Sequence, residues 1–404
     1  MVDFNDTERE AEFREAVRVF VDEHHPEVLT DENRYSSTLG GLPVGRLSEA
    51  ERKEQMRPWH AALKERGWIA PAWPKEYGGA DLTTMEQFIL GEVFAEKRAS
   101  GVQIRNDAAS TIMLYGSEEL KQKYLPGMLD IDESWAQGYS EPGSGSDLAS
   151  LQTRATRDGD DFVLNGQKIW TSGADKAKMM FGLFRTDPEA PKHRGISYIL
   201  VPMDTPGIKP NPIEQITGSR SFNEVFFEDA RVPVGNVVGE INRGWYAAAT
   251  TLDFERSQVG SAVGLYHLLS DLLKTIREEA EPGGYSRLGD PSRRAAFADN
   301  HIEAEVARLF SYRVITMQNR NQVPNYEASI QKVFVSEVKQ RMAKTAYGLL
   351  GLYAQLADKE DPRAPMRSKW QMFTISTIAE TIGAGTSEIQ RNVIATRGLG
   401  LPRG

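Results

Sequence analysis

The stretch RATRDGDDFVLNGQKIW (154–170) marks a change in the pattern of the sequence. It contains two β-type runs around an Asp-Gly pair, which is a strong short-range signal for a hairpin. Further β-type runs follow at short, turn-punctuated intervals: MMFGLFRTD (179–187), ISYILVPMD (196–204), IKPNPIEQ (208–215) and FNEVFFEDARVP (222–233). This spacing is typical of an antiparallel sheet or barrel and predicts a β domain in the middle of the chain.

Helical patterns lie on both sides of this β segment. Before it, we expect helices at about 6–22, 48–66, 83–98 and 117–129. After about residue 239 the 3.6-residue period returns, and we expect a helix that carries Glu255 and runs to about 279, then helices near 298–318, 326–356, 368–382 and 387–396. The sequence therefore predicts an α+β multidomain protein with an N-terminal helical domain (1–133), a middle antiparallel β domain (134–239) and a C-terminal helical bundle (240–404), the helical parts packing together around the Glu255 helix.

Composition narrows the class of protein. The chain has 404 residues, 40% of them hydrophobic, which is too long for one core and enough for two or three lobes. It has no cysteine, so any redox chemistry would come from a bound cofactor. The net charge of -9 without long like-charge runs argues against nucleic acid or an anionic membrane as partner. With no signal-peptide pattern and no membrane-length apolar run, we expect a cytoplasmic protein without a membrane span.

Three segments rich in glycine and hydroxyl side chains are candidates for binding. WAQGYSEPGSGSDLAS (135–150) lets the backbone approach a ligand, NGQKIWTSG (165–173) ends a strand with a large aromatic, and IGAGTSEIQRNVIA (382–395) places a flexible turn before a helix start that attracts anions. Each has a plainer interpretation, as a loop of turn formers, a core tryptophan or an ordinary helix cap. None is a Rossmann or Walker A motif, and the six histidines have no metal-ligand spacing.

The stretch LDFER (252–256) places a carboxylate, Glu255, on the apolar face of its helix. The apolar positions of this face are Trp245, Ala248, Ala249, Leu252, Val259, Ala262, Val263 and Tyr266. Two interpretations stand: a buried structural pair with an arginine such as Arg256, or a carboxylate whose pKa burial raises for use as a base.

In this order and spacing, the three segments resemble the acyl-CoA dehydrogenase flavoprotein family over essentially the whole chain. SEPGSGSD is similar to the family signature [ST]EPxAGSD, NGQKIWTSG to the segment of its flavin-stacking tryptophan, and GAGTSEIQRNVIATRGLGLPR to its C-terminal signature. The chain looks closest to a bacterial branch that carries QGxSEPGSGSDLASL and includes subunits of heteromeric enzymes. The resemblance implies an oxidoreductase of fatty-acid β-oxidation and lipid degradation that uses FAD to convert an acyl-CoA to a trans-2-enoyl-CoA.

The resemblance also implies partners: an electron-transfer flavoprotein as electron acceptor, and assembly as a homodimer or homotetramer, with a heteromer as the alternative. Two other functions stay open. One is a same-fold flavin oxidase or monooxygenase, and the other is a non-catalytic subunit of a heteromer.

Site residues carry over from the family by position. Tyr139, Ser140, Trp170, Thr171 and Ser172 match residues around the flavin ring, and Thr386 and Glu388 match residues that hold the FAD pyrophosphate and ribose. Ser146, assigned to both cofactor and substrate, matches a contact of the CoA pantetheine chain, and Asp253 and Arg256 match positions that approach CoA.

The catalytic base departs from the majority pattern of the family. Most members have a glutamate just before the Gly-Thr pair of the C-terminal motif, where this chain has Ala384. A minority, including isovaleryl-CoA and long-chain dehydrogenases, take the base from a segment like LDLER. LDFER is similar to it and places Glu255 at the base position, while the backbone N–H of Ala384 remains a donor to the thioester oxygen.

Two further departures concern the adenine end of FAD. The family usually has an arginine followed by Phe-Gly where this chain reads GYSRLGDPSRR (284–294), and Gln-x-x-Gly-Gly-x-Gly where it reads TAYGLLGLY, with Thr345 in place of glutamine. Either FAD is held differently, or a non-identical partner subunit supplies these groups. Ala247 and Ala248 are candidates for the acyl pocket, and Arg105 either lies on the surface or faces this pocket. If Arg105 faces that pocket, a dicarboxylic or steroid-side-chain acyl-CoA becomes a candidate substrate.

Overall fold

The computed structural model describes residues 6–29, 47–99, 106–255, 260–278, 287–320, 322 and 324–402. The helices in this part are α1 (Glu8–His24), α2 (Glu49–Glu65), α3 (Thr84–Glu96), α4 (Asn106–Tyr115), α5 (Glu118–Met128), α6 (Gly244–Glu255), α7 (Gly260–Glu278), α8 (Pro291–Asn319), α9 (Tyr326–Leu350), α10 (Lys369–Glu380) and α11 (Ser387–Val393). The strands are β1 (Trp135–Gly138), β2 (Arg154–Asp158), β3 (Asp161–Ser172), β4 (Met179–Arg185), β5 (Ile196–Pro202), β6 (Ile208–Ile213) and β7 (Phe222–Pro233). This order of helices, strands and helices confirms the predicted fold class.

The chain divides into two compact units. The sheet unit comprises residues 60–81 and 102–256, and the helical unit comprises residues 1–59, 82–101 and 257–404.

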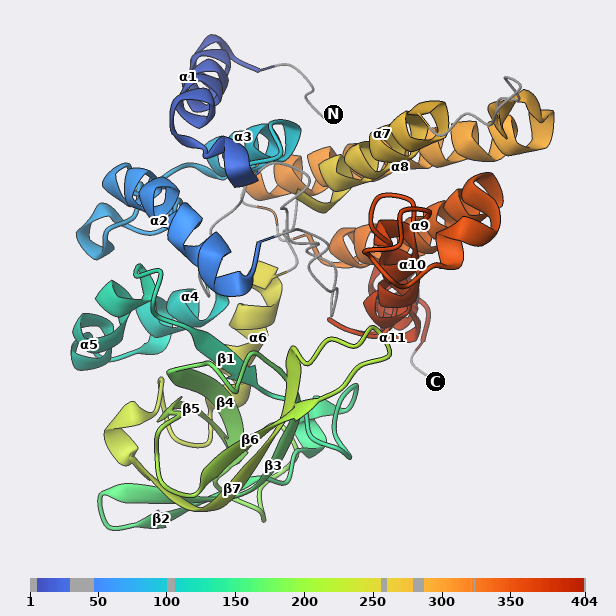
Figure 1. The fold of residues 1–404 in the computed structure, drawn as a ribbon. Helices are drawn as coiled ribbons and strands as arrows, with labels where there is room; N and C mark the ends of the chain where they lie inside the picture. Colours follow the sequence, from blue (N-terminus) through green and yellow to red (C-terminus); the bar gives the residue numbers. More distant parts are fainter. Residues whose placement is uncertain are drawn as a thin grey trace. The chain divides into compact units, whose positions relative to one another are not determined.

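All seven strands form one curved sheet in the order β1-β4-β2-β3-β7-β6, with β5 paired to β4 (Figure 1). The predicted hairpin is present: Asp158 of β2 faces Asp161 of β3, and Gly159 adopts the φ of +64° that its turn requires. Most strand pairs are antiparallel, as predicted, but β1 pairs with β4 in parallel and β2 meets β4 in parallel at one residue pair. The sheet is therefore mixed, because β1 arrives from the preceding helices rather than from a hairpin.

The inner face of the sheet carries a fully buried apolar core. Alternate residues of β3 and β7, such as Phe162, Leu164, Val225 and Phe227, pack with Phe184 of β4. This alternation is the period-2 pattern that predicted the strands.

The helix that ends at Glu255 packs within the sheet unit, on one helix from the N-terminal part of the chain and on two strands. α6 contacts α4, β5 and β4. At its first residue, Gly244, an added Cβ would lie 2.1 Å from the backbone nitrogen of Tyr198, so only glycine allows this approach to β5. Ala247 and Ala248 are buried, but Ala249, expected on the same buried face, is exposed.

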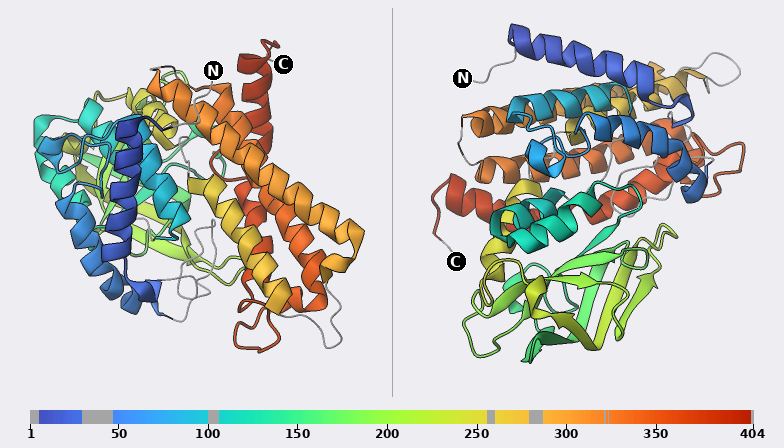
Figure 2. Two further views of the ribbon diagram at one scale, coloured as in Figure 1. Left: turned by 90° about the horizontal axis from the view of Figure 1, so that it is seen from above. Right: turned by 90° about the vertical axis from the view of Figure 1, so that its left-hand side faces the viewer.

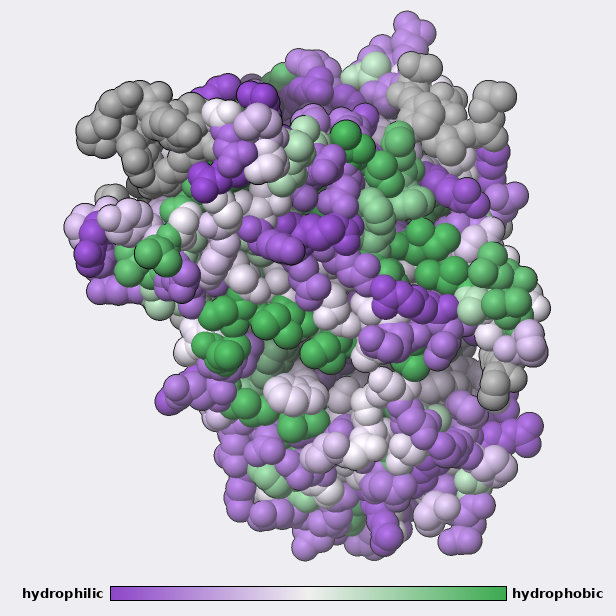
Figure 3. Space-filling view, turned by 90° about the vertical axis from the view of Figure 1, so that its right-hand side faces the viewer, coloured by the Kyte–Doolittle hydropathy of each residue, from purple (hydrophilic) through white to green (hydrophobic). Residues whose placement is uncertain are grey.

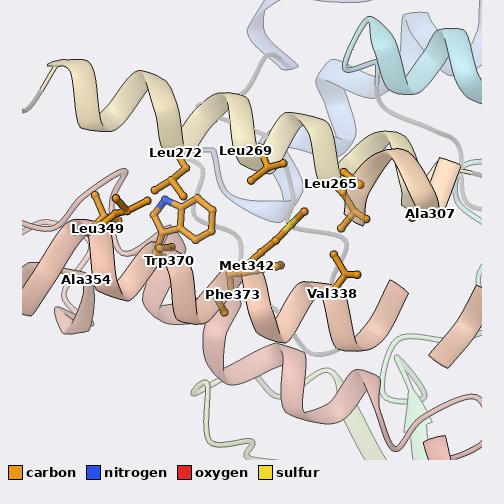
Figure 4. Packing of buried hydrophobic residues seen from close by; sticks show 14 of the residues in the cluster. Leu265, Leu269, Leu272, Ala307, Val338, Met342, Leu349, Ala354, Trp370 and Phe373 are labelled. Atoms are coloured by element: carbon orange, nitrogen blue, oxygen red, sulfur yellow. The ribbon is translucent and has the colours of Figure 1, made fainter. Parts of the chain in front are cut away.

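Helices α7, α8, α9 and α10 form the core of the helical unit. Leu265, Leu269 and Leu272 of α7 face Val338 and Met342 of α9, and Trp370 and Phe373 of α10 complete the cluster (Figure 4). The long helices α8 and α9 lie side by side (Figure 2). α3 packs on α7 and α8, so N-terminal and C-terminal helices do pack together. They meet around α7, which lies within the range 240–279 predicted for the helix that carries Glu255.

Local signals placed most helices to within a few residues. The side chain of Thr83 accepts a hydrogen bond from the backbone N–H of Glu86 at the start of α3, and Ser117 caps α5 in the same way. α4 and β1 were not predicted. α4 is a ten-residue helix with small and polar residues, and β1 has four residues, so neither is long enough to show a clear period.

Neither a membrane-spanning helix nor a metal-binding cluster is found in the part of the chain that the structure describes. No helix there is long and apolar enough to cross a membrane. No group of three or more histidine, aspartate or glutamate side chains there is arranged to hold a metal ion.

Candidate functional site

A β-bulge presents Trp170 at the end of β3. Between Lys168 and Thr171 the strand advances three residues while β7 advances two, from Val225 to Asn223. Trp170 takes the left-handed φ of 60°, which is uncommon for a large side chain. Its indole is 57% exposed and meets the Phe222 ring edge-on at a centroid distance of 6.1 Å. The interpretation of Trp170 as a core residue is therefore wrong.

The neighbours of Trp170 alternate between the interior and the surface. Thr171 is fully buried, and its carbonyl accepts a hydrogen bond from Asn223 at 3.1 Å. Ser172 is exposed. Trp170 and Ser172 thus lie on the outer side of the strand, whereas the side chain of Thr171, predicted to bind the cofactor, points into the sheet unit.

The loop 139–150 is joined to this strand end by the backbone. The N–H of Ile169 donates to the carbonyl of Ser140 at 2.9 Å. The Tyr139 ring is buried against Phe181 and Tyr198, at centroid distances of 5.8 and 6.3 Å, while Ser140 is half-buried. Ser140 is therefore bonded to the residue that precedes Trp170, and the Tyr139 ring belongs to the core.

Two serines of the SEPGSGSD motif differ in their environment. The Ser144 side chain is buried, and its hydroxyl lies 3.0 Å from the carbonyl of Asp147 and 3.2 Å from that of Leu148, either of which can accept its hydrogen bond. Ser146 is exposed. Ser144 thus stabilises the loop itself, and Ser146 has a hydroxyl that faces the surface.

A buried ion pair lies under this loop. The Nζ atom of Lys168, a fully buried side chain, donates to Glu141 Oε1 at 2.8 Å and to the carbonyl of Tyr139 at 3.3 Å. Glu141 also accepts hydrogen bonds from the backbone N–H groups of Gln152 and Thr153, at 2.6 and 2.9 Å. The carboxylate therefore closes the loop 141–153 from within.

Burial and charge act in opposite directions on this pair. Burial raises the pKa of the Glu141 carboxyl, but the Lys168 charge and the accepted hydrogen bonds outweigh it, so the pKa lies below the ordinary 4.5. Burial lowers the pKa of the Lys168 ammonium, and Glu141 opposes that change. Sequence reasoning missed the pair. Lys168 does, however, share the inward parity of Phe162 and Leu164 along β3, which is a signal for burial.

The C-terminal motif forms a turn before α11 in the helical unit. Ala384 and Gly385 have left-handed φ values of 53° and 84°, and Thr386 caps α11 by accepting from the N–H of Ile389 at 3.2 Å. The side-chain amide of Gln390 donates to the carbonyl of Ala384 at 3.2 Å, which fixes the peptide orientation there. The Gln390 side chain thus holds the Ala384–Gly385 peptide, while the N–H of Ala384 belongs to the preceding peptide.

Glu388 lies exposed in the first turn of α11. Its pKa is lowered chiefly by a backbone hydrogen bond and by the Thr386 side chain. The predicted cap and helix start are both present.

The predicted base lies at the edge of what the structure describes. Glu255 is the last residue of α6 in the sheet unit, but its side chain and that of Asp253 lie outside the described residues, as does all of Arg256. Arg105 and residues 284–286 lie outside them too, whereas Thr345 is half-buried on α9. The roles given to these residues stay predictions.

Comparison with family models covers most of the chain. Residues 43–132 match the acyl-CoA dehydrogenase N-terminal domain, residues 136–230 the middle domain, and residues 242–399 the C-terminal domain. Acyl-CoA dehydrogenase IpdE1 of Mycobacterium tuberculosis (strain ATCC 25618 / H37Rv) is 36% identical over 97% of this chain and 98% of its own. This chain belongs to the acyl-CoA dehydrogenase family. Its class is therefore that of flavin-dependent oxidoreductases.

Other members of the family, solved and curated, are similar over their whole length. Acyl-CoA dehydrogenase FadE26 of the same M. tuberculosis strain is 34% identical over 93% of this chain and 94% of its own. A structure titled Tcur3481-Tcur3483 steroid ACAD is 34% identical with a TM-score of 0.83, and the ChsE4-ChsE5 complex from M. tuberculosis is 32% identical with a TM-score of 0.83; both comparisons cover 100% of each chain. Within the acyl-CoA dehydrogenase family, this chain is thus similar to proteins solved as two-protein assemblies.

Proposed function

We propose that this acyl-CoA dehydrogenase oxidises the α,β carbon–carbon bond of an acyl-CoA thioester to a trans-2-enoyl-CoA, with FAD as cofactor and Glu255 as base. One observation carries the assignment of the flavin. Trp170 exposes a large aromatic face in a strained backbone conformation, two residues before Ser172 and next to Ile169, whose N–H bonds to Ser140. An exposed indole held at such a cost in free energy is typical of a ligand-binding position.

The residues present fit an isoalloxazine ring. Trp170 offers an apolar face for packing, and the exposed Ser172 offers a hydroxyl to a ring edge. In the helical unit, the turn at Gly385 and the cap at Thr386 offer backbone and hydroxyl groups to the pyrophosphate. Bound FAD supplies the acceptor for the hydride that leaves the β carbon.

Glu255 would remove the α-proton of the thioester. A carboxylate in water, with a pKa of about 4.3, is a poor base for so weak an acid. Loss of water around the carboxylate raises its pKa, and a donor to the thioester oxygen lowers the energy of the enolate that develops. The position of Glu255 in LDFER and the alanine at position 384 support this assignment, and the N–H of Ala384 is the proposed donor. Ser146, Asp253 and Arg256 would hold the CoA part.

The proposed substrate is an acyl-CoA with a bulky ring-containing acyl group of the steroid type. Support comes from the solved relative whose title names it a steroid ACAD, with 34% identity over the whole of both chains. Cyclohexane-1-carbonyl-CoA dehydrogenase of Geobacter metallireducens, 28% identical over 82% of this chain, has a name that also states a ring-containing thioester.

We further propose that the chain assembles with a second acyl-CoA dehydrogenase chain and passes its electrons to an electron-transfer flavoprotein. Figure 3 shows hydrophobic residues exposed among hydrophilic ones on one face of the molecule. In the helical unit the exposed apolar side chains include Leu352, Tyr353, Ile378, Ile382, Leu399 and Leu401. Exposed apolar surface of this kind marks protein interfaces. The departures from the family pattern at Thr345 and in 284–294 are consistent with a partner that supplies missing groups to FAD. Light scattering measures the mass of the chain alone and of the chain co-expressed with a second acyl-CoA dehydrogenase chain. We expect a complex of both chains in the second sample.

The decisive experiment is anaerobic bleaching of the bound flavin by a panel of linear, branched, dicarboxylic and steroid acyl-CoA thioesters. We expect bleaching, fastest with the steroid thioesters, and a loss of at least about a hundredfold in rate for Glu255→Gln with FAD retained. Glu228→Gln, at an exposed position of β7, is the matched control and should bleach normally. Normal bleaching by Glu255→Gln would remove the base assignment, and rapid reoxidation of the reduced protein by air would indicate an oxidase instead.

A further inference from the structure

The backbone around Ser140 is anchored at three consecutive residues by one short segment of β3. The Lys168 ammonium bonds to the carbonyl of Tyr139 and to the carboxylate of Glu141, and the N–H of Ile169 bonds to the carbonyl of Ser140. Residues 139, 140 and 141 are thus all held from positions 168 and 169. The residue that follows this segment is Trp170.

The same carboxylate fixes the far end of the loop. Glu141 Oε1 accepts from both Lys168 and the N–H of Thr153, and Oε2 accepts from the N–H of Gln152. Arg185 reinforces the closure by donating to the carbonyls of Ala149 and Leu151, at 2.7 and 3.3 Å. Ser140 can therefore move relative to Trp170 only if buried, charged hydrogen bonds break.

This network places two opposite charges in the interior of the sheet unit. Replacing a buried ion pair with apolar groups of similar volume is often neutral for stability, so a pair that is kept in the interior has a role that apolar packing would not supply. On the apolar side of the pair, the centroid of the Phe184 ring lies 5.3 Å from the Lys168 Nζ.

We propose that the buried Lys168–Glu141 pair is a positioning device for the flavin, which fixes the Ser140 loop and the Trp170 indole as one rigid binding edge. Lys168 and Glu141 are positioning residues, since they act through Ser140 and Trp170. The inference rests on the proposed function, and it adds Lys168 and Glu141 to the residues that serve FAD binding. A pre-formed edge reduces the ordering that flavin binding would otherwise require.

The test compares FAD binding by the full-length apoprotein and its variants. Lys168→Met with Glu141→Gln removes both charges of the pair, so neither partner is left buried without the other. We expect this double variant to fold, to bind FAD with a Kd at least about tenfold higher and to show a changed visible circular dichroism of the bound flavin. We also expect less quenching by FAD of the fluorescence that Trp170 contributes, measured as the difference between each protein and its Trp170→Phe form. The matched control, Lys209→Met with Glu228→Gln, removes a pair of the same charges on β6 and β7 whose side chains are both 63% exposed, and should match wild type.

Unchanged Kd, quenching and dichroism in a folded double variant would overturn the proposal. If the double variant does not fold, Lys168→Arg carries the test, because it keeps the buried positive charge opposite Glu141 but changes the length and shape of the donor that bonds to Tyr139 and Glu141. The same changes are expected in this variant, and wild-type values would again overturn the proposal. Failure of the wild-type chain to bind FAD would overturn both the proposed function and this inference, whereas wild-type binding with unchanged variants would overturn the inference alone.

Discussion

The two segments proposed to hold FAD are built in different ways. Around Trp170, in the sheet unit, side chains make the structure: a buried ammonium and carboxylate fix the loop and the bulge. Around Ala384, in the helical unit, the backbone makes it: two left-handed residues lead into a capped helix. The first segment presents an aromatic face, and the second presents N–H groups.

This difference predicts how each segment responds to substitution. A site made by buried charges loses much stability when one charge is removed, because the other is left unpaired. A site made by backbone conformation responds to changes in φ preference and is insensitive to the identity of an exposed side chain. The predictions below test this contrast, from the largest expected effect to the smallest.

Lys168→Met alone should give the largest effect. It leaves the Glu141 carboxylate buried without its ammonium, which is expected to cost about 3–5 kcal/mol in the free energy of unfolding. Urea unfolding measures this. Lys209→Met, which breaks an exposed pair, should change stability by less than about 1 kcal/mol. Equal losses in the two variants would contradict the contrast.

Acid should reduce the stability that the Lys168–Glu141 pair contributes to the folded protein. Because the pKa of Glu141 is lower in the folded protein than the ordinary 4.5, its contribution to stability is fully present above pH 4.5 and is lost as the pH falls through the lowered value. We expect the free energy of unfolding of wild type to fall more steeply below about pH 4.5 than that of Glu141→Gln, measured by urea unfolding at a series of pH values. Parallel profiles would show that Glu141 does not titrate with folding.

Trp170→Ala should separate binding from stability. The indole is more than half exposed and its φ is unfavourable, so the free energy of unfolding should change by less than about 1 kcal/mol. FAD affinity should fall by about 10–100-fold, the range expected for one lost aromatic stacking contact. Titration of the apoprotein with FAD measures this, and Trp170→Phe, which keeps a ring, should lose less. Full FAD affinity in Trp170→Ala would remove the stacking role.

Gly385→Ala should destabilise the helical unit modestly. Its φ of +84° disfavours alanine, and the added Cβ would lie 2.5 Å from the side-chain nitrogen of Gln390. We expect a loss of about 1–2 kcal/mol in the free energy of unfolding and a smaller loss of FAD affinity, because Gln390 can shift. A variant as stable as wild type would show that the turn is not constrained.

Ala384→Gly should give the smallest effect and the opposite sign. Alanine at a φ of 53° is strained, so glycine should be neutral or stabilise the chain by up to about 1 kcal/mol. The backbone N–H is retained, so flavin bleaching by acyl-CoA should proceed at a rate close to that of wild type. A large loss of bleaching rate would show that the alanine side chain itself has a role.

Much of the fold follows from local sequence. The Asp-Gly turn at Gly159, the alternation in β3 and β7 and the caps at Thr83, Ser117 and Thr386 act between residues close in the chain, so their signals survive in the sequence alone. The order of helical, β and helical segments was predictable for the same reason. The short elements α4 and β1 were not, because packing rather than periodicity stabilises them.

Within the candidate site, the sequence alone identified the three segments and the residue types, and the resemblance gave them roles. The helical period of the sequence also placed Glu255 on an apolar face, and the role of base that the resemblance gives it stays a prediction. Only the tertiary structure decided that Trp170 faces outward and Thr171 inward, that Tyr139 is a core residue, that α6 packs on β5, and that Lys168 meets Glu141. These features depend on contacts between residues 27 or more positions apart, as for the Lys168–Glu141 hydrogen bond, and no local pattern encodes such a contact.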